Sequence, residues 1–523
     1  MKTRTRTWQC HLLFVCLLIL YGSTASAYDF SFDGIYYNYK YGELAVAGAE
    51  SSIQDVIIPS QVEYKSNKYL VTSIEERAFE NHTDITSVKI PETITSIGEY
   101  AFNGHLNSVH INSLELWCKI KFGNGYANPL RFADHFFVKE EEIIDDLTIP
   151  NSVTYIEDYA FYGCKIFKSI SIPNSVVRIG REVFLFCRNI SSITIGSSLT
   201  SIPDGCFKEC SSLKSVTIPN SVTSIGYYAF EDCTSLTSVA IPNSVTEICD
   251  NAFTFCISLE SLTIPSSIIK IGSAFTLCDG LKEIIIEDGT APLMLDYGLF
   301  WTCPLETIYI GRDIIYNNNA LNYNPAFYNQ KNLKNITIGN LVSSIGDDAF
   351  QGCDSLTSLI IGESVTSIGG SAFEGCSSLC SLTIPESVTK IGYDAFTGCN
   401  GLKELIMEDG NDTLLFGDDG FPFFKDCPLE TLYLGRNLSA LRRSPFHDLK
   451  NLVVSIGKPV TSIDKYLFET CNIKSIAFYS YNIKGIEYCG FDSDTPVTLC
   501  TKSDFSGISN TNLTYFNKIT VIK

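Results

Sequence analysis

Cysteines are the residues best placed to do chemistry, and most of them recur at one fixed position. The chain has 523 residues with 20 cysteines, and twelve of these stand three residues after a phenylalanine. Thiols form disulfides or bind metals, but a repeated spacing stacks them in one column with parallel Cβ vectors. We therefore expect reduced, buried thiols that pack as small apolar side chains, with mostly paired cysteines as the alternative. The twelve are Cys164, Cys187, Cys210, Cys233, Cys256, Cys278, Cys303, Cys353, Cys376, Cys399, Cys427 and Cys471.

Cysteines outside this column are better candidates for disulfides, and Cys489 with Cys500 is the strongest pair. A metal site is poorly supported, because no C-x-x-C occurs and the chain has only 6 histidines. We expect neither a metal nor a cofactor. Beyond the first 27 residues, which hold Cys10 and Cys16, the cysteines outside the column are Cys118, Cys206, Cys249, Cys380, Cys489 and Cys500.

Tyrosine and arginine gather in two long insertions that resemble each other. The segment Cys303–Arg312 returns as Cys427–Arg436, and Gly280–Gly289 returns as Gly401–Gly410. Both residue types are enriched at interface hot spots, so these side chains are predicted to bind a ligand; ordinary packing of the long turns is the alternative. The candidates are Tyr309, Arg312, Tyr316 and Tyr323 in the first insertion and Tyr433, Arg436, Arg442 and Arg443 in the second.

No motif brings catalytic groups together. The chain lacks G-x-S-x-G, G-x-x-x-x-G-K, H-E-x-x-H and G-x-G-x-x-G. His105 and His110 have no acidic partner at a fixed offset. The acidic segment 409–412 resembles half of a calcium loop but lacks the terminal Glu. The sequence therefore predicts a protein that is not an enzyme.

All these residues are positioned by a repeat of about 23 residues. The segment Leu213–Ser235 returns with most of its letters as Leu236–Ser258. A fixed period of 20–29 residues predicts a leucine-rich repeat solenoid. The anchor phenylalanines of the successive coils are Phe79, Phe102, Phe161, Phe184, Phe207, Phe230, Phe253, Phe275, Phe300, Phe327, Phe350, Phe373, Phe396, Phe424, Phe446 and Phe468.

One coil indicates the local structure. Leu213, Val216 and Ile218 follow the L-x-x-L-x-L pattern, which predicts a short strand with its apolar side chains on one side. Pro219 ends the strand, because proline cannot donate to a ladder hydrogen bond, and Phe230 points inward from a short helical or 3-10 turn. A single coil cannot bury its own apolar face, so stacked neighbours stabilise each other. We expect a β-rich solenoid of about 18 such coils.

The ends of the chain depart from the period. Residues 28–70 are rich in tyrosine and have no anchor phenylalanine, which favours a β-rich N-terminal cap. Residues 71–475 hold the repeats, and 476–523 are predicted to form a C-terminal cap. Caps are required because terminal coils would otherwise expose apolar faces and open strand edges.

The first 27 residues are predicted to be a signal peptide, with an uncleaved anchor as the alternative. Lys2, Arg4 and Arg6 precede the apolar run His11–Leu20, and small residues at 25–27 favour cleavage before residue 28. No later stretch is apolar for long enough to span a membrane. The formal net charge of −20 argues against nucleic acid and anionic membranes as partners. We therefore expect an exported protein that is secreted or held at the cell surface.

The repeats resemble the BspA-like (Treponema-type) leucine-rich repeat family of cell-surface proteins. The resemblance is clearest in Ile218–Gly226 followed by Ala229-Phe230 and Cys233, and in Ile384–Gly392. It covers roughly residues 28–475, and several coils depart from it by lacking the cysteine. It implies a leucine-rich solenoid, secretion or surface display, and adhesion to host or neighbouring-cell proteins, including extracellular matrix. It supplies no catalytic residues. The coils without the cysteine carry His82, His105, Gln330 and Leu449 at that site.

The most consistent function is protein–protein recognition or adhesion outside the cell, with glycans as a second class of partner. The outward strand positions, such as Ser215 and Thr217, suit either a docking face for an extended partner or a simple solvated sheet. Two alternatives stay open. One is an exported enzyme or glycan-processing factor with its site between the long insertions, and the other is a passive surface spacer.

Overall fold

The computed structural model divides the chain into two compact units. The first unit comprises residues 1–144 and 157–166, and the second comprises 145–156 and 167–523. The predicted signal peptide lies outside the described residues, so its cleavage stays a prediction. The described residues are 28–316, 324–417, 423–439, 444–446, 449–464, 466–480, 483, 494–499 and 517–521.

The first unit contains two sheets that change from antiparallel to parallel pairing along the chain. β1, β2 and β3 pair antiparallel, and β5 forms a hairpin with β6. From the pairing of β3 with β6 onward, successive strands of that sheet are parallel. The strands of this sheet are β1(Phe30–Phe32), β2(Ile35–Lys40), β3(Glu43–Ala49), β5(Gln61–Tyr64), β6(Asn67–Ile74), β8(Ser96–Ile97) and β10(Lys121–Phe122). Those of the other are β4(Asp55–Ile57), β7(Ser87–Ile90), β9(Leu106–Ile111), β11(Ala133–Val138) and β12(Glu141–Glu142).

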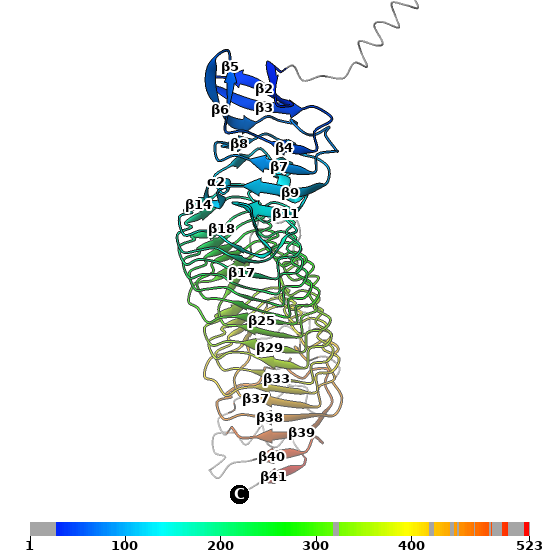
Figure 1. The fold of residues 1–523 in the computed structure, drawn as a ribbon. Coiled ribbons are helices and arrows are strands. Elements are labelled where there is room, and N and C mark those ends of the chain that lie inside the picture. The colour runs from blue at the N-terminus through cyan, green and yellow to red at the C-terminus, as the bar shows by residue number, and fades with distance from the viewer. Residues whose placement is uncertain are drawn as a thin grey trace, which may run out of the picture. The chain divides into compact units, whose positions relative to one another are not determined.

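In the second unit, one strand of each coil joins a series of parallel principal strands (Figure 1). They are β13(Asp145–Thr148), β15(Phe167–Ser171), β17(Ser192–Thr194), β19(Ser215–Thr217), β21(Ser238–Ala240), β23(Ser261–Ile264), β25(Glu283–Ile286), β27(Thr307–Ile310), β29(Asn335–Ile338), β31(Ser358–Ile360), β33(Ser381–Ile384), β35(Glu404–Met407), β37(Thr431–Leu434), β38(Leu452–Ile456), β39(Ile473–Phe478), β40(Val497–Leu499) and β41(Ile519–Val521).

A second strand of most coils joins a parallel series on another side of the coil. Its members are mostly only two residues long, because a turn follows at once. They are β14(Tyr155–Ile156), β16(Arg178–Ile179), β18(Ser201–Ile202), β20(Ser224–Ile225), β22(Glu247–Ile248), β24(Lys270–Ile271), β26(Leu293–Leu295), β28(Ile314–Tyr316), β30(Ser344–Ile345), β32(Ser367–Ile368), β34(Lys390–Ile391) and β36(Leu415–Phe416).

The register of the sheet equals the sequence period, so each side chain lies over its own copy. Val216 pairs with Ile193 on one side and Val239 on the other. The anchor phenylalanines are buried, and their rings stack at centroid distances between 5.2 Å for Phe230 with Phe253 and 6.1 Å for Phe446 with Phe468. This burial is the main source of stability, since a single coil has almost no core of its own.

The turns before and after the anchor phenylalanine are not helical in the described part of the second unit, contrary to expectation. Tyr228 and Asp232 flank Ala229-Phe230 with φ of 58° each, and left-handed residues on both sides interrupt a right-handed helix. The amide of Phe230 donates instead to the carbonyl of Ala252 in the next coil at 2.7 Å. The described helical turns are α2(Leu114–Trp117), η1(Gly125–Ala127) and η2(Pro129–Arg131) of the first unit.

The structure confirms the leucine-rich repeat solenoid, with about 19 coils where about 18 were expected. The boundaries of the two caps, at residues 70 and 476, stay predictions. Within the described part of the chain, no helix combines the length and the apolar character needed to cross a lipid bilayer.

Candidate functional site

The candidate site lies on the outward side of the principal strands in the second unit. Here one side chain per strand forms a series that we call the outward ladder. Most of its members are small or hydroxylated, but Tyr309 on β27 and Tyr433 on β37 are large. The ladder consists of Ser171, Thr194, Thr217, Ala240, Thr263, Ile285, Tyr309, Thr337, Ile360, Thr383, Ile406, Tyr433, Ser455 and Ala477.

Each of the two tyrosines has an isoleucine neighbour in the ladder. Ile285 pairs with Tyr309, and Ile406 pairs with Tyr433. Five strand steps separate the two tyrosines, which corresponds to about 24 Å at the usual strand spacing. The duplicated segments of the sequence therefore place two equivalent aromatic positions on one face.

Each tyrosine is held by a carboxylate from the preceding coil. The hydroxyl of Tyr309 donates to Oδ1 of Asp288 at 2.6 Å, and that of Tyr433 donates to Oδ1 of Asp409 at 2.7 Å. The bond to Asp288 is the main cause that raises the pKa of Tyr309. Burial, followed by the bond to Asp409, raises the pKa of Tyr433 to about 12. Both hydroxyls therefore stay protonated donors at neutral pH.

A glycine in the following coil makes room for each hydroxyl. A Cβ atom on Gly339 would lie 2.8 Å from the Tyr309 hydroxyl, and one on Gly457 would lie 2.8 Å from that of Tyr433. We call each set a Tyr–Asp module: Tyr309 with Asp288 and Gly339, and Tyr433 with Asp409 and Gly457. The aspartates and glycines were not predicted as site residues, although both aspartates stand in a repeated Glu-Asp-Gly segment, at 287–289 and 408–410.

The two predicted arginines that fall among the described residues lie inside the protein, in contrast to Tyr309 and Tyr433. Arg312 and Arg436 are fully buried. The guanidinium of Arg312 donates to the carbonyls of Pro265 and Ser266 at 2.8 Å each. Arg436 donates to the carbonyls of residues 384–386 and 388 at 2.5–3.3 Å. Burial lowers the pKa of both arginines. They tie together coils two steps apart, and in this arrangement a ligand cannot reach them.

Tyr316 also faces inward. It ends β28, and its ring stacks on that of Tyr297 at 4.9 Å. The Tyr316 hydroxyl oxygen accepts a hydrogen bond from the backbone amide of Ala326 at 3.3 Å, and burial raises the pKa of Tyr316. The other predicted ligand-binding residues, Tyr323, Arg442 and Arg443, lie outside the described residues. Among the predicted ligand-binding residues that the structure describes, Tyr309 and Tyr433 therefore lie on the outward face, whereas Arg312, Tyr316 and Arg436 do not.

The column thiols are hydrogen-bonded rather than paired with each other. Cys233 donates from Sγ to the carbonyl of Phe207 at 3.2 Å, and Cys256 donates likewise to Phe230 at 3.3 Å. Both thiols are free and buried. In one of the coils without the cysteine, the side-chain amide of Gln330 donates the equivalent hydrogen bond to the carbonyl of Phe300 at 2.7 Å. This geometry fits the expected reduced column.

The cysteines outside the column form no disulfide among the residues described. Cys118 and Cys206 are buried, Cys249 is half-buried and Cys380 is exposed. Burial raises the pKa of Cys118 to about 12, so its thiol is a poor nucleophile. The favoured pair, Cys489 with Cys500, lies outside the described residues. Within the described ranges, no group of three or more metal-ligating side chains occurs.

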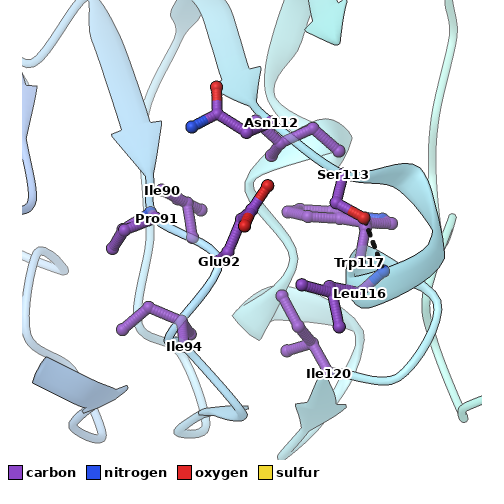
Figure 2. Close-up of a pocket in the computed structure, with 10 residues that line it drawn as sticks. Ile90, Pro91, Glu92, Ile94, Asn112, Ser113, Leu116, Trp117 and Ile120 are labelled. Carbon is purple, nitrogen blue, oxygen red and sulfur yellow. Dashed lines mark hydrogen bonds between the residues drawn. The ribbon is translucent and has the colours of Figure 1, made fainter. Parts of the chain in front are cut away.

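Cavities in both units bear on the enzyme alternative. One of about 10 Å³ lies in the first unit between β7 and α2, with Glu92 near its rim and Trp117 at its side (Figure 2). It has room for about one water molecule. A second of about 40 Å³ lies beside Arg312 and Tyr316. No carboxylate is among its described lining residues.

A third, more open hollow of about 500 Å³ lies in the first unit and is lined by Glu75 and Glu76 among others. Glu75 is already engaged there, since it pairs with Lys40 at 2.6 Å and accepts a hydrogen bond from Asn38 at 2.9 Å. Among the described residues, the cavity beside the first insertion therefore lacks the close carboxylates that the enzyme alternative requires, whereas the hollow in the first unit holds two.

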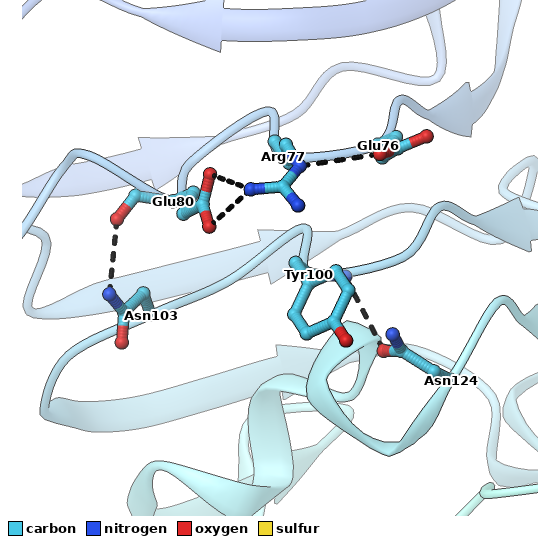
Figure 3. Close-up of polar contacts among 6 residues, drawn as sticks. All are labelled: Glu76, Arg77, Glu80, Tyr100, Asn103 and Asn124. Carbon is cyan, nitrogen blue, oxygen red and sulfur yellow. Dashed lines mark hydrogen bonds and ion pairs between the residues drawn. The ribbon is translucent and has the colours of Figure 1, made fainter.

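An exposed row of arginine and tyrosine in the first unit was missed by the sequence analysis. The guanidinium of Arg77 lies 5.1 Å from the ring of Tyr100, and it also pairs with Glu80 at 2.8 Å (Figure 3). Tyr100 lies 5.6 Å from Tyr126, whose ring is covered by Arg131 at 4.2 Å. Since cations already cover these rings, we assign the row a structural role.

Short parallel strands stacked in register over buried leucine, phenylalanine and cysteine columns define a leucine-rich repeat solenoid. A family model described as BspA type Leucine rich repeat region (6 copies) matches residues 49–121, 132–227, 200–325, 322–453 and 420–523. The chain therefore belongs to the BspA-type leucine-rich repeat family, which confirms the resemblance seen in the sequence.

A comparison with solved structures gave the following matches. A leucine-rich repeat protein from Bacteroides ovatus is 27% identical, with a TM-score of 0.51, and the match covers 78% of this chain and 94% of that chain. A leucine rich cell surface protein from Faecalibacterium prausnitzii is 24% identical, with a TM-score of 0.31, and the match covers 75% of this chain and 95% of that chain. A search of curated proteins gave no match.

Proposed function

We propose that this protein is a secreted or surface-displayed, non-enzymatic recognition protein that binds extracellular proteins through the outward ladder. Its biological role would be adhesion to host or neighbouring-cell proteins, including extracellular matrix, with glycans as a second class of partner. The observation that carries the proposal is the pair of equivalent Tyr–Asp modules on one face, whose other side chains are mostly small or hydroxylated with three isoleucines among them.

The chemistry of the ladder supports docking of a protein. Tyr309 and Tyr433 are partly accessible and are each fixed by an aspartate, so binding would cost little side-chain entropy. Ile360, two strand steps from Tyr309 along the ladder, is 56% exposed and adds apolar area between the modules. Repeat solenoids use such extended faces for binding, and the predicted signal peptide would deliver the chain to extracellular partners.

The test is binding of purified 28–523 to an immobilised panel of matrix proteins, mucins and glycans. We expect saturable binding to at least one protein, and at least a tenfold loss of affinity in the Tyr309→Ser/Tyr433→Ser variant. The matched control is Tyr227→Ser/Tyr393→Ser, which removes two tyrosines that are 48% and 50% exposed outside the ladder. No saturable binding to any member of the panel would contradict the proposal and favour the passive spacer.

A further inference from the structure

Three exposed apolar side chains and one half-buried one lie on consecutive turns of the second unit. They lie in the turn that follows the anchor phenylalanine and precedes the next principal strand. Phe255, Ile257 and Trp301 are 40%, 44% and 66% exposed, and Leu277 is half-buried. The turns are adjacent, because the amide of Phe255 bonds to the carbonyl of Thr276 and that of Leu277 bonds to Thr302. We call Phe255, Ile257, Leu277 and Trp301 the apolar turn patch.

Two residues of this patch occupy backbone positions that do not suit them. Phe255 and Leu277 have φ of 61° and 60°, a conformation that large L-residues rarely adopt. Three later coils have glycine at the same place, namely Gly352, Gly375 and Gly398, with φ of 74–75°. Phe186 and Asp232 are also left-handed at this position, with φ of 63° and 58°, so the distinguishing feature of Phe255 is its exposed ring rather than the conformation alone. Packing does not explain Phe255, since its ring is exposed.

Acidic side chains border the patch on the same turns. Asp232 stands one coil before Phe255 at the same position, and Asp279 stands one coil after Ile257. Near Asp232, the cations of Arg188 and Lys208 are already paired with other carboxylates. No ion pair to Asp232 or Asp279 occurs among the described residues. The border is therefore negative, in line with the net charge of −20.

We propose that the apolar turn patch docks a polypeptide segment with an apolar anchor flanked by lysine or arginine. The anchor would cover Trp301 and Phe255, and the flanking cations would face Asp232 and Asp279. A second copy of this chain fits poorly, because it would bring equally acidic borders together. An anionic membrane would be repelled for the same reason. The apolar turn patch is separate from the outward ladder, so binding at one surface can be lost without affecting binding at the other.

The fluorescence of Trp301 provides a direct test in the purified 28–523 chain. Residues 28–523 contain one further tryptophan, Trp117, which is buried. The probes are three tryptophan-free peptides: a Phe/Leu core flanked by lysines, the same core flanked by glutamates, and a serine core flanked by lysines. We expect only the first to shift the emission to shorter wavelength and to reduce acrylamide quenching at least twofold. Added salt should weaken its binding.

Glycine substitutions at left-handed positions inside and outside the patch separate loss of the apolar side chains from relief of backbone strain. The Phe255→Gly/Leu277→Gly variant should lose at least tenfold in affinity for the first peptide while keeping or raising its thermal midpoint. Phe186→Gly relieves the same strain at φ of 63° outside the patch and should leave binding intact. The proposal is overturned by absent binding, by equal binding of the other peptides, by an unaffected double variant, or by a Trp301 shift with zwitterionic lipid vesicles.

Discussion

The thiol of Cys233 donates a hydrogen bond of 3.2 Å to the backbone carbonyl of Phe207, which belongs to the preceding coil. The bond recurs along the column, for example from Cys376 to Phe350 at 3.5 Å. A thiol is a weak donor, but here it is also small and apolar enough to fill the gap beside the stacked rings. The cysteine therefore has a structural reason to recur that requires neither disulfide nor metal.

Gln330 tests whether this position requires a donor. Gln330→Cys should be tolerated, because a thiol makes the same bond in neighbouring coils. Gln330→Ala should lower the free energy of unfolding by about 1–3 kcal/mol, since it removes a buried hydrogen bond and leaves a void. Thermal unfolding followed by circular dichroism measures both. Equal losses in the two variants would contradict the donor role.

Phe230 should be essential to the phenylalanine column. Its ring is buried and stacks on Phe207 and Phe253 at 5.4 and 5.2 Å. Phe230→Ala should cost about 3–5 kcal/mol of unfolding free energy, as for other buried aromatic truncations. Tyr227→Ala, at an exposed position of the same coil, should change it by less than about 0.5 kcal/mol. Overlaid melting curves of Phe230→Ala and wild type would refute this packing.

Gly339 should contribute to stability by leaving room for the hydroxyl of Tyr309 in the preceding coil. Gly339→Ala would push a methyl group against the Tyr309 hydroxyl and disturb its bond to Asp288, costing about 0.5–1.5 kcal/mol. In a Tyr309→Phe background the same substitution should cost less, because the clashing hydroxyl is gone. A double-mutant cycle on thermal unfolding measures the coupling. Strictly additive effects would show that the module is not a unit.

Thiol reactivity should separate the exposed cysteine from the column. Cys380 is exposed, whereas burial raises the pKa of Cys353 to about 12, so little thiolate exists there at pH 8. Alkylation of native 28–523 mapped by mass spectrometry should modify Cys380 first and Cys353 only on unfolding. A Cys380→Ser variant is the control for the fast phase. Comparable rates at both positions would argue against a closed column.

Stability should fall at alkaline pH. Burial raises the pKa of Cys303 and Cys353 to about 12 in the folded protein, from an ordinary value of 9.0. The folded state thus holds protons that the unfolded state releases, so this contribution is complete below pH 9 and is lost as pH rises toward 12. Thermal midpoints at pH 8 and pH 10.5 measure the effect. A Cys303→Ala/Cys353→Ala variant should decline less steeply, and an equal decline would contradict the assignment.

Much of the fold could be predicted from the sequence, because a fixed repeat length determines which residues of successive coils lie beside each other. A repeat of about 23 residues forces Val216 to lie between Ile193 and Val239 if the coils stack in register, and the structure has this pairing. Successive side chains of a strand point to opposite faces of the sheet, and this alternation determines which of them are buried. The helical character of the turns was predicted wrongly, since left-handed residues such as Tyr228 depend on hydrogen bonds to the next coil.

The sequence alone determined the solenoid, its columns and the duplicated insertions of this protein. Only the tertiary structure decided which residues of the insertions face outward. Tyr309 and Arg312 are three residues apart, yet one lies on the outward ladder and the other reaches carbonyl groups two coils away. That difference depends on what lies across the stack, such as the space left by Gly339. Local sequence patterns report the period of the chain, whereas contacts between coils follow from how their side chains fill the space between them.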